Sequence, residues 1–295
     1  MYYIGIDLGT SAAKLLLVDA DGRILNTVTR EYPLEFPAPG WSQQAPEDWK
    51  AAVWAGVPEL LRGFDASAVA GIGVGGQMHG LVVLDKEGRV IRPAILWNDG
   101  RTAKQVDYLN GTVGRETLSR WTANIAFAGF TAPKLLWMRE NEQENFAKIA
   151  KIMLPKDYVN YCLTGIHGCD YSDASGMLLL DVEHKRWSRA MLELCGVCEG
   201  QVPQLRESWA VVGTLLPNVA RELGLSTQVK VVAGAGDNAA AAIGRAGTIG
   251  SVEPGKQADL VILDRDPLAV PQEELRDIRV LETWKDGVPI FCREA

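Results

Sequence analysis

Apolar runs and short polar breaks alternate through the first thirty residues. The apolar runs lie at residues 2–6, 14–18 and 23–29, and the breaks are Asp7-Leu-Gly-Thr-Ser11 and Asp19-Ala-Asp-Gly22. Glycine and aspartate are typical of tight reversals between neighbouring strands. The pattern therefore predicts a three-stranded antiparallel meander at the start of the chain.

Further along, buried strands alternate with segments of helical period. Their periodicity predicts strands at residues 69–74, 81–84, 89–91 and 228–234, and helices at residues 46–62, 101–110, 131–150, 154–164 and 186–197. This alternation predicts an α/β domain with a mostly parallel sheet and the meander at one edge. The last stretch differs, since it predicts a strand at 258–263, a short helix at 271–275 and a hairpin of 280–284 with 288–291.

The composition narrows the class of protein. The 295 residues are 47% hydrophobic and 23% charged, with a formal net charge of -7, which disfavours a nucleic-acid partner because such a partner needs a basic face. No apolar run reaches the ~20 residues that span a bilayer. The first residues lack the basic region of a signal peptide, and the five cysteines are irregularly spaced. We therefore expect a cytoplasmic protein with no membrane partner.

The first polar break is a candidate phosphate site. Gly9 lets the backbone approach a ligand, and the amides of the turn with the hydroxyls of Thr10 and Ser11 can surround a phosphate. Asp7 could position a magnesium ion or its waters. The alternative is a hairpin turn that uses glycine and aspartate only for their turn geometry.

Two later segments have side chains that suit a sugar. In Gln77-Met78-His79-Gly80 the glutamine and histidine offer hydrogen bonds to hydroxyls, and the methionine offers an apolar wall. Trp97-Asn98-Asp99-Gly100-Arg101 combines an aromatic ring, an amide, an acid and a base. The alternatives are a structural histidine with a satisfied partner and an ordinary polar turn.

Asp237 is a candidate general base. It follows an apolar run and a Gly-Ala-Gly turn and precedes an alanine run, a pattern that predicts a strand, a turn and a helix. There it could take a proton from an attacking hydroxyl. The alternative is a helix N-cap, a role compatible with the first.

Taken in order, these segments resemble the FGGY family of carbohydrate kinases, and within it the xylulokinases. The resemblance covers about residues 1–244. It is carried by Tyr3-Ile-Gly-Ile-Asp-Leu-Gly-Thr-Ser11, Gly76-Gln-Met-His-Gly80, Arg92-Pro-Ala-Ile-Leu-Trp-Asn-Asp-Gly-Arg101, Gly129-Phe-Thr-Ala-Pro-Lys134, Leu154-Pro-Lys-Asp-Tyr158 and Gly234-Ala-Gly-Asp-Asn-Ala-Ala-Ala-Ala242.

The resemblance implies an actin-like, ribonuclease H-like ATPase fold, with residues 1–244 as the first, sugar-binding domain of two. It also implies ATP, Mg²⁺ and phosphate transfer to the 5-position of D-xylulose. Asp237 matches the proton acceptor. Together, the residue types and the resemblance give a substrate-binding set of Gln77, Met78, His79, Trp97, Asn98, Arg101 and Asn238. The cofactor-binding set is Asp7, Gly9, Thr10, Ser11 and Lys14, with Asp7 also at the magnesium ion.

The end of the chain departs from that family. Family members continue past the catalytic aspartate into a second actin-like domain with a second phosphate motif and the adenosine site, and nothing here matches either. Residues from about 248 to 291 resemble instead the C-terminal end of an amidohydrolase-superfamily protein. We therefore expect two parts, a kinase domain at 1–244 and a β-rich, amidohydrolase-like tail at 245–295.

Two functions remain open. One is a truncated, weakly active or inactive kinase of the xylulokinase type, and the other is a non-catalytic sugar-binding fragment. An amidohydrolase is excluded because its metal centre needs clustered histidines, and the chain has only His79, His167 and His184. An actin-type or chaperone-type ATPase would not explain residues 77–80 and 97–101. The face left exposed by a missing domain predicts association or a homodimer.

Overall fold

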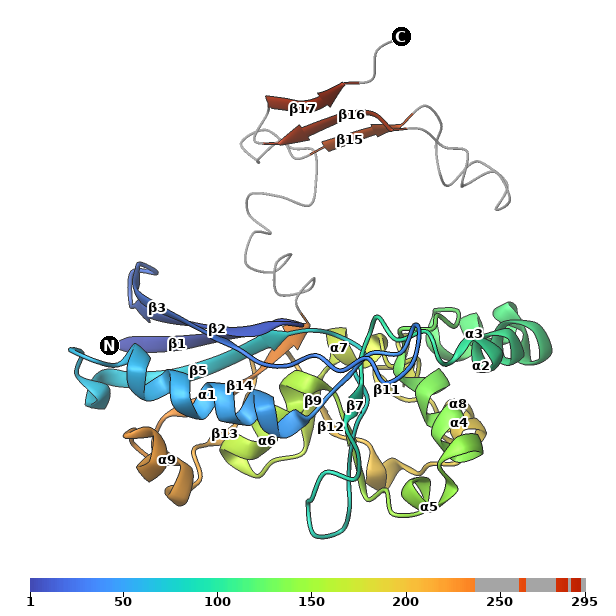
Figure 1. The fold of residues 1–295 in the computed structure, drawn as a ribbon, viewed down its shortest axis with the longest axis horizontal. Helices are drawn as coiled ribbons and strands as arrows, with labels where there is room; N and C mark the ends of the chain where they lie inside the picture. The colour runs from blue at the N-terminus through green and yellow to red at the C-terminus, as the bar shows by residue number, and fades with distance from the viewer. Residues whose placement is uncertain (237–259, 264–279, 286–287, 293–295) are drawn as a thin grey trace. The chain divides into compact units, whose positions relative to one another are not determined.

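The computed structural model describes residues 1–236, 260–263, 280–285 and 288–292 (Figure 1). The chain divides into two compact units, Met1–Ala239 and Ala240–Ala295. In the described part of the second unit, strands β15 (Leu260–Leu263), β16 (Val280–Lys285) and β17 (Val288–Cys292) form an antiparallel sheet in that order. The predicted tail hairpin is thus confirmed, and the predicted helix at 271–275 lies outside the described residues.

A six-stranded mixed sheet forms the centre of the first unit. Its spatial order is β13 (Val211–Thr214), β14 (Lys230–Gly236), β5 (Val69–Gly76), β1 (Tyr2–Leu8), β2 (Ala12–Asp19) and β3 (Ile24–Glu31). The meander of β1, β2 and β3 is confirmed. The prediction of a mostly parallel sheet is wrong, because only β14, β5 and β1 run parallel. Short turns can join only antiparallel neighbours, and β13 adds an antiparallel strand at the other edge.

Three helices lie on one face of this sheet (Figure 1). They are α1 (Pro46–Leu60), α6 (Pro155–Thr164) and α9 (Pro217–Leu223). Each begins with a proline in its first turn, where the missing N–H leaves no hydrogen bond unmade. The strand residues that face the helices are buried, as Ile4, Ile6 and Leu8 are in β1. This apolar layer fixes the sheet that carries the site.

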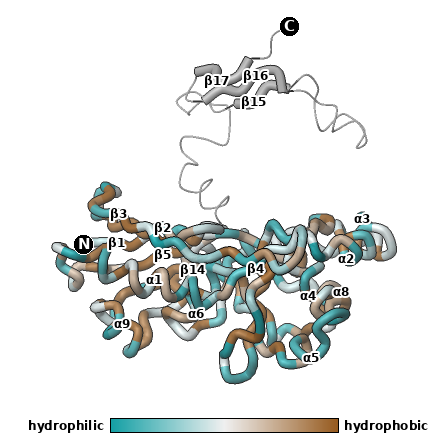
Figure 2. Tube along the Cα trace, viewed as in Figure 1, coloured by the Kyte–Doolittle hydropathy of each residue, from teal (hydrophilic) through white to brown (hydrophobic). Residues whose placement is uncertain are grey.

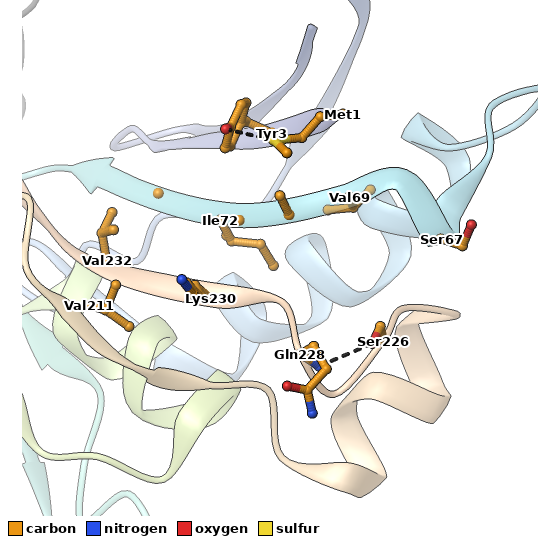
Figure 3. A pocket seen from close by; sticks show the side chains of 13 residues that line it. Met1, Tyr3, Ser67, Val69, Ile72, Val211, Ser226, Gln228, Lys230 and Val232 are labelled. Carbon is orange, nitrogen blue, oxygen red and sulfur yellow. Dashed lines mark hydrogen bonds between the residues drawn. The ribbon is translucent and has the colours of Figure 1, made fainter. Parts of the chain in front are cut away.

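The opposite face of the sheet is hollowed. A cavity of about 600 Å³ lies across β1, β5 and β14, where Tyr3, Val211, Lys230 and Val232 line it (Figure 3). Along β5 the residues on this side are glycines, so the surface has few side chains to fill the hollow. The expectation of an apolar face left exposed by a missing domain, and the association built on it, stay predictions.

A second apolar core lies among the remaining elements of the first unit. The helices of this part are α2 (Ala103–Asp107), the π-helix η2 (Tyr108–Gly114), α3 (Arg115–Thr122), α4 (Thr131–Asn141), α5 (Gln143–Phe146), α7 (Tyr171–Ser175) and α8 (Arg189–Cys195). Helix α4 is buried along most of its length, and α5 is largely hydrophilic (Figure 2). The predicted helix 131–150 is therefore two helices, and the predicted helix 101–110 continues into η2.

Short pairs of strands and single turns connect these helices. Their bounds are β4 (Gln43–Gln44), β6 (Val82–Leu84), β7 (Ala94–Ile95), β8 (Lys151–Met153), β9 (Gly168–Asp170), β10 (Leu180–Asp181), β11 (Arg186–Trp187), β12 (Gln204–Arg206), and the 3-10 turns η1 (Ala66–Ala68) and η3 (Glu199–Gln201). The predicted strand at 89–91 is reduced to one bridge between Leu84 and Val90. Within the described ranges, no helix has the length and apolar character needed to cross a membrane.

Candidate functional site

The ends of three parallel strands bring the predicted segments together. Strands β1, β5 and β14 pair at their last residues, Leu8, Gly76 and Gly236. From there the chain continues into residues 9–11, here called the phosphate turn, and residues 77–80, here called the substrate loop. Because the carboxyl ends of parallel strands share one edge of a sheet, the two segments start side by side.

The last residue of β14 approaches the substrate loop closely. A Cβ atom at Gly236 would lie 2.5 Å from Cγ and 2.7 Å from Sδ of Met78. Only glycine therefore lets Met78 pack against the strand at this point. Asp237 and Asn238 follow directly in the sequence and lie outside the described residues, so their assigned roles stay predictions.

His79 occupies a left-handed backbone turn, with φ of 65°. Its carbonyl oxygen accepts hydrogen bonds from Lys134 Nζ at 2.8 Å and Thr131 Oγ1 at 3.2 Å. Its ring lies tilted against Phe130, with 4.8 Å between the ring centroids. Burial, with the charge of Lys134 as the second cause, lowers the pKa of His79 to about 4. The imidazole is then neutral near pH 7 and can both donate to and accept from a hydroxyl.

Trp97 links the sugar-side segment to the phosphate turn. Its indole Nε1 donates a hydrogen bond to Thr10 Oγ1 at 3.0 Å. The Trp97 side chain is still 48% exposed, so it offers an aromatic surface beside that bond. Asn98 is exposed next to it. Trp97, which is predicted to contact the sugar, thus lies directly beside Thr10, which is predicted to contact the phosphate.

Gln77 faces inward rather than toward solvent. It is 2% exposed, and its amide donates to Gln44 Oε1 at 3.1 Å and to the Gly9 carbonyl at 3.5 Å. Gln44 in turn donates to the Thr10 carbonyl at 2.7 Å and accepts from Trp49 Nε1 at 3.1 Å. These hydrogen bonds fix the backbone carbonyls of Gly9 and Thr10 on the buried side of the phosphate turn. The proposed contact of Gln77 with a sugar stays a prediction.

Arg101 is buried as well. Its guanidinium pairs with Asp99, with 2.8 Å between Nη2 and Oδ2, and lies 4.0 Å from the ring centre of Trp41 and 5.0 Å from that of Trp137. Such a charge pair packed against two aromatic rings holds its own loop in shape. The geometry gives Arg101 a structural role, and its predicted contact with a sugar stays a prediction.

Asp7 and Lys14 face each other across the β1–β2 pair at the phosphate turn. Both are exposed, as is Ser11. In the part of the chain that the structure describes, no group of three or more His, Cys, Asp and Glu side chains could hold a metal ion. Magnesium commonly binds through one or two carboxylates and the oxygens of a bound phosphate. Asp7 fits that arrangement, with Lys14 available to a phosphate oxygen.

A buried charge cluster lies beside Met78. Lys156 Nζ is 2.6 Å from Asp157 Oδ1, 2.9 Å from Asp170 Oδ1 and 3.5 Å from Asp173 Oδ2. Asp173 Oδ1 would lie 3.1 Å from a Cβ atom at Gly236, so the cluster reaches the end of β14. Burial raises the pKa of Asp173 to about 8, although Lys156 opposes the shift.

Sequence reasoning missed Gln44, Lys134 and the four residues of this Lys156 cluster. Lys134 and Lys156 stand in segments that carry the family resemblance, but the sequence alone assigned them no role. The signal was a lysine inside an apolar run, which is uncommon because a buried charge needs partners. Gln44 follows a proline-rich loop and carries no comparable signal.

Comparison with known families supports the grouping of these segments. Residues 2–244 match the FGGY family of carbohydrate kinases, N-terminal domain, and residues 207–291 match the amidohydrolase family. Over 242 residues the chain is 44% identical to the xylulose kinase of Escherichia coli (strain K12), covering 82% of this chain and 49% of that protein.

Solved structures show the same likeness. A "xyloylose kinase" from Brucella ovis superposes with a TM-score of 0.81 at 42% identity, covering 84% of this chain and 51% of that one. A xylulose kinase from Rhodospirillum rubrum gives a TM-score of 0.81 at 28% identity, covering 89% and 53%. These likenesses confirm the expected actin-like α/β fold. The chain spans about half the length of the curated relatives it matches. Because the family match runs through the sheet, the phosphate turn and the substrate loop, the chain belongs to the FGGY family of carbohydrate kinases.

Proposed function

We propose that residues 1–244 are the sugar-binding half of an ATP-dependent kinase that phosphorylates the 5-hydroxyl of D-xylulose. One observation carries this proposal: the hydrogen bond from Trp97 to Thr10 joins the sugar-side segment to the phosphate turn. A sugar at the substrate loop would then lie beside a phosphate at the turn. The relatives named above are xylulose kinases, which supports a ketopentose as the substrate.

The proposed roles follow from side-chain chemistry. Met78 supplies an apolar wall and the neutral His79 exchanges hydrogen bonds with sugar hydroxyls, with Asn238 as a further contact. Asp237 is proposed as the general base. It would take the proton of the 5-hydroxyl as that oxygen bonds to the γ-phosphorus of ATP and the bond to the ADP oxygen breaks.

The phosphate side is proposed to use the turn after β1. Gly9 gives the backbone close access to a phosphate, and Thr10, Ser11 and Lys14 supply donors. Asp7 would hold magnesium directly or through its waters. When bound, the ion would neutralise phosphate charge.

We also propose that this chain alone phosphorylates weakly or not at all. The support is the match of residues 207–291 to another family. The division into 1–244 and 245–295 is part of this proposal. The boundary between the two compact units falls near the same place in the sequence, after Ala239. The same match favours the second candidate, a non-catalytic sugar-binding fragment.

Two measurements on the full chain test the proposal. Titration calorimetry with millimolar D-xylulose is expected to give heat, and a coupled assay of ADP release with ATP and Mg²⁺ is expected to give turnover far below the usual ~1–100 per second of kinases. No heat would contradict sugar binding, and ordinary turnover would contradict the weak activity. Weak turnover that Asp237→Asn abolishes would favour the kinase over the fragment.

A further inference from the structure

A fully buried lysine holds the backbone of the substrate loop. Lys134 in α4 has no exposed surface, and its Nζ donates to the His79 carbonyl at 2.8 Å and to the Gly129 carbonyl at 2.7 Å. Thr131, one turn earlier on the same helix, donates to the same His79 carbonyl at 3.2 Å. Two side chains of one helix therefore converge on one oxygen of the loop.

The turn at His79 needs such support. A side chain with a Cβ atom is disfavoured at φ of 65°, because the Cβ crowds the following carbonyl. A conformation of this kind persists only when the surroundings determine it. The carbonyl is the atom that both α4 side chains fix, and rotating it would break both bonds. The helix thus selects the backbone that sets the direction of the His79 ring.

The second carbonyl connects the lysine to the aromatic side of the site. Gly129 packs so closely under Trp97 that an added Cβ atom would lie 2.5 Å from the Trp97 carbonyl oxygen. Phe130 follows Gly129 and lies against the His79 ring. One amine group therefore ties the substrate loop to the turn that packs against the Trp97 backbone and the His79 ring.

We propose that Lys134 is a positioning residue of the sugar site, fixing the backbone at His79 and Gly129 so that Met78, His79 and Trp97 keep their places around the sugar. The proposal rests on the sugar site proposed above. Lys134 touches no substrate itself in this role, since two backbone carbonyls take its hydrogens.

The pKa of Lys134 is consistent with a buried amine that acts as a hydrogen-bond donor. Burial lowers the pKa of Lys134 well below its usual value, while Asp99 opposes that shift and Arg101 adds to it. The two carbonyls need only two N–H donors, which the amine supplies whether or not it keeps its third proton. Its charge is also the second cause, after burial, that lowers the pKa of His79. The pKa of His79 is therefore a measure of the charge on Lys134.

The test is Lys134→Met in the full chain, which keeps the length and apolar stem and removes the donors and the charge. D-xylulose affinity is expected to fall roughly tenfold or more, because the backbone at His79 and Gly129 would lose the hydrogen bonds that hold the sugar-binding side chains in place. In the same variant the pKa of His79, followed by proton NMR of its ring, is expected to rise above about 4 but to stay below its ordinary value, because burial, the larger cause, remains. The chain has three histidines, so His79→Gln identifies the resonance, and His167 and His184 serve as internal references.

Three further variants separate positioning from general destabilisation. Leu135→Ala opens the buried apolar side of the same helix, and Lys148→Met removes an exposed lysine; both are expected to leave the sugar affinity and the pKa of His79 unchanged. Thr131→Val removes the second donor to the same carbonyl and is expected to weaken binding by a smaller factor. If Lys134→Met does not fold, Thr131→Val becomes the variant that tests the proposal.

The inference is overturned if folded Lys134→Met binds D-xylulose as the wild type does and leaves the pKa of His79 unchanged, or if Leu135→Ala produces the same shifts. It is equally overturned if Lys134→Met fails to fold and Thr131→Val changes neither quantity. Absence of sugar binding by the wild-type chain would instead defeat the proposed function, and backbone chemical shifts of residues 78–80 in Lys134→Met would still test whether Lys134 holds the turn at His79.

Discussion

At the scale of single residues, two glycines shape the end of β14. A Cβ atom at Gly234 would lie 1.8 Å from the Val74 carbonyl oxygen, and its φ of 74° is left-handed. The pairing of β14 with β5 shifts register between Val232 and Ala235, around this glycine. The shift leaves Gly236 paired with Gly76, where Met78 can pack over it. The position of the substrate loop thus depends on glycine at 234 and 236, because a side chain at either position would collide with Val74 or Met78.

Gly236→Ala is expected to weaken D-xylulose binding by roughly tenfold or more, because the new methyl group would displace Met78. Overpacking of this kind also destabilises by ~1–3 kcal/mol. Calorimetry gives the first quantity and urea unfolding the second. Gly111→Ala is the matched control, since a Cβ atom added at that glycine would meet no packing neighbour within 4 Å. Equal affinity in wild type and Gly236→Ala would refute the close contact.

A turn whose residues are neighbours in the sequence could be placed from the sequence. The break at residues 7–11 could be predicted because glycine, aspartate and hydroxyl residues stand together between two strands, and its phosphate role stays a prediction. The roles of Lys134 and Gln77 could not be found in this way. Both are decided by carbonyl and amide partners that the fold brings from distant positions, such as His79 for Lys134 and Gln44 for Gln77.

At the scale of elements, α6, β9 and α7 meet around Lys156. Its three carboxylate partners come from all three elements, and the whole cluster is buried. Three carboxylates around one ammonium would leave excess negative charge away from water. One carboxyl is therefore expected to keep its proton. Burial raises the pKa of both Asp157 and Asp173, and because that of Asp173 reaches about 8 we expect Asp173 to be that group.

Asp173→Asn is expected to weaken the dependence of stability on pH. In the folded chain Asp173 holds its proton up to about pH 8, whereas in the unfolded chain it loses it near its ordinary value of 3.8. Between those values the folded state binds one more proton, so the free energy of unfolding falls as pH rises, by at most ~1.4 kcal/mol per pH unit. The asparagine removes that contribution.

Urea unfolding of wild type and Asp173→Asn at pH 5, 6 and 7 measures the difference. The wild type is expected to lose more stability over this range than the variant. Asp48→Asn, in the first turn of α1, is the control for loss of a carboxylate outside the cluster. Parallel curves for wild type and Asp173→Asn would show that Asp173 is ionised throughout.

Elements with a long, regular pattern could be predicted, and short ones could not. Helices α1 and α6 could both be predicted from their periodicity. The helix predicted over 131–150 breaks at Glu142, whose backbone leaves the helical region with ψ of 55°. Strand β13 has four residues, too few to show alternation, and its antiparallel pairing changed the expected sheet.

At the scale of the whole molecule, the hollowed face of the sheet predicts self-association. Tyr3 and Val211 are exposed at the cavity across β1, β5 and β14, beside glycines that leave it unfilled (Figure 3). An apolar surface of this kind commonly marks a place of contact between proteins. Sedimentation velocity is expected to show oligomers that grow with chain concentration.

Val211→Lys is expected to shift that equilibrium toward the monomer, because a charge on this face resists burial. Phe36→Lys, which changes an exposed aromatic residue outside the cavity lining, is the matched control and should leave the equilibrium unchanged. A wild-type chain that stays monomeric at every concentration would contradict the prediction of self-association.

The Lys156 cluster also bears on the order in which the chain folds. All its charges come from residues 156–173, whereas pairing of β5 with β14 joins residues near 71 to residues near 230. Contacts between sequence neighbours form sooner, since a short loop loses little chain entropy on closing. The four charges can therefore gather while the sheet is still open. These four groups then do not have to enter the interior of the folding chain one at a time.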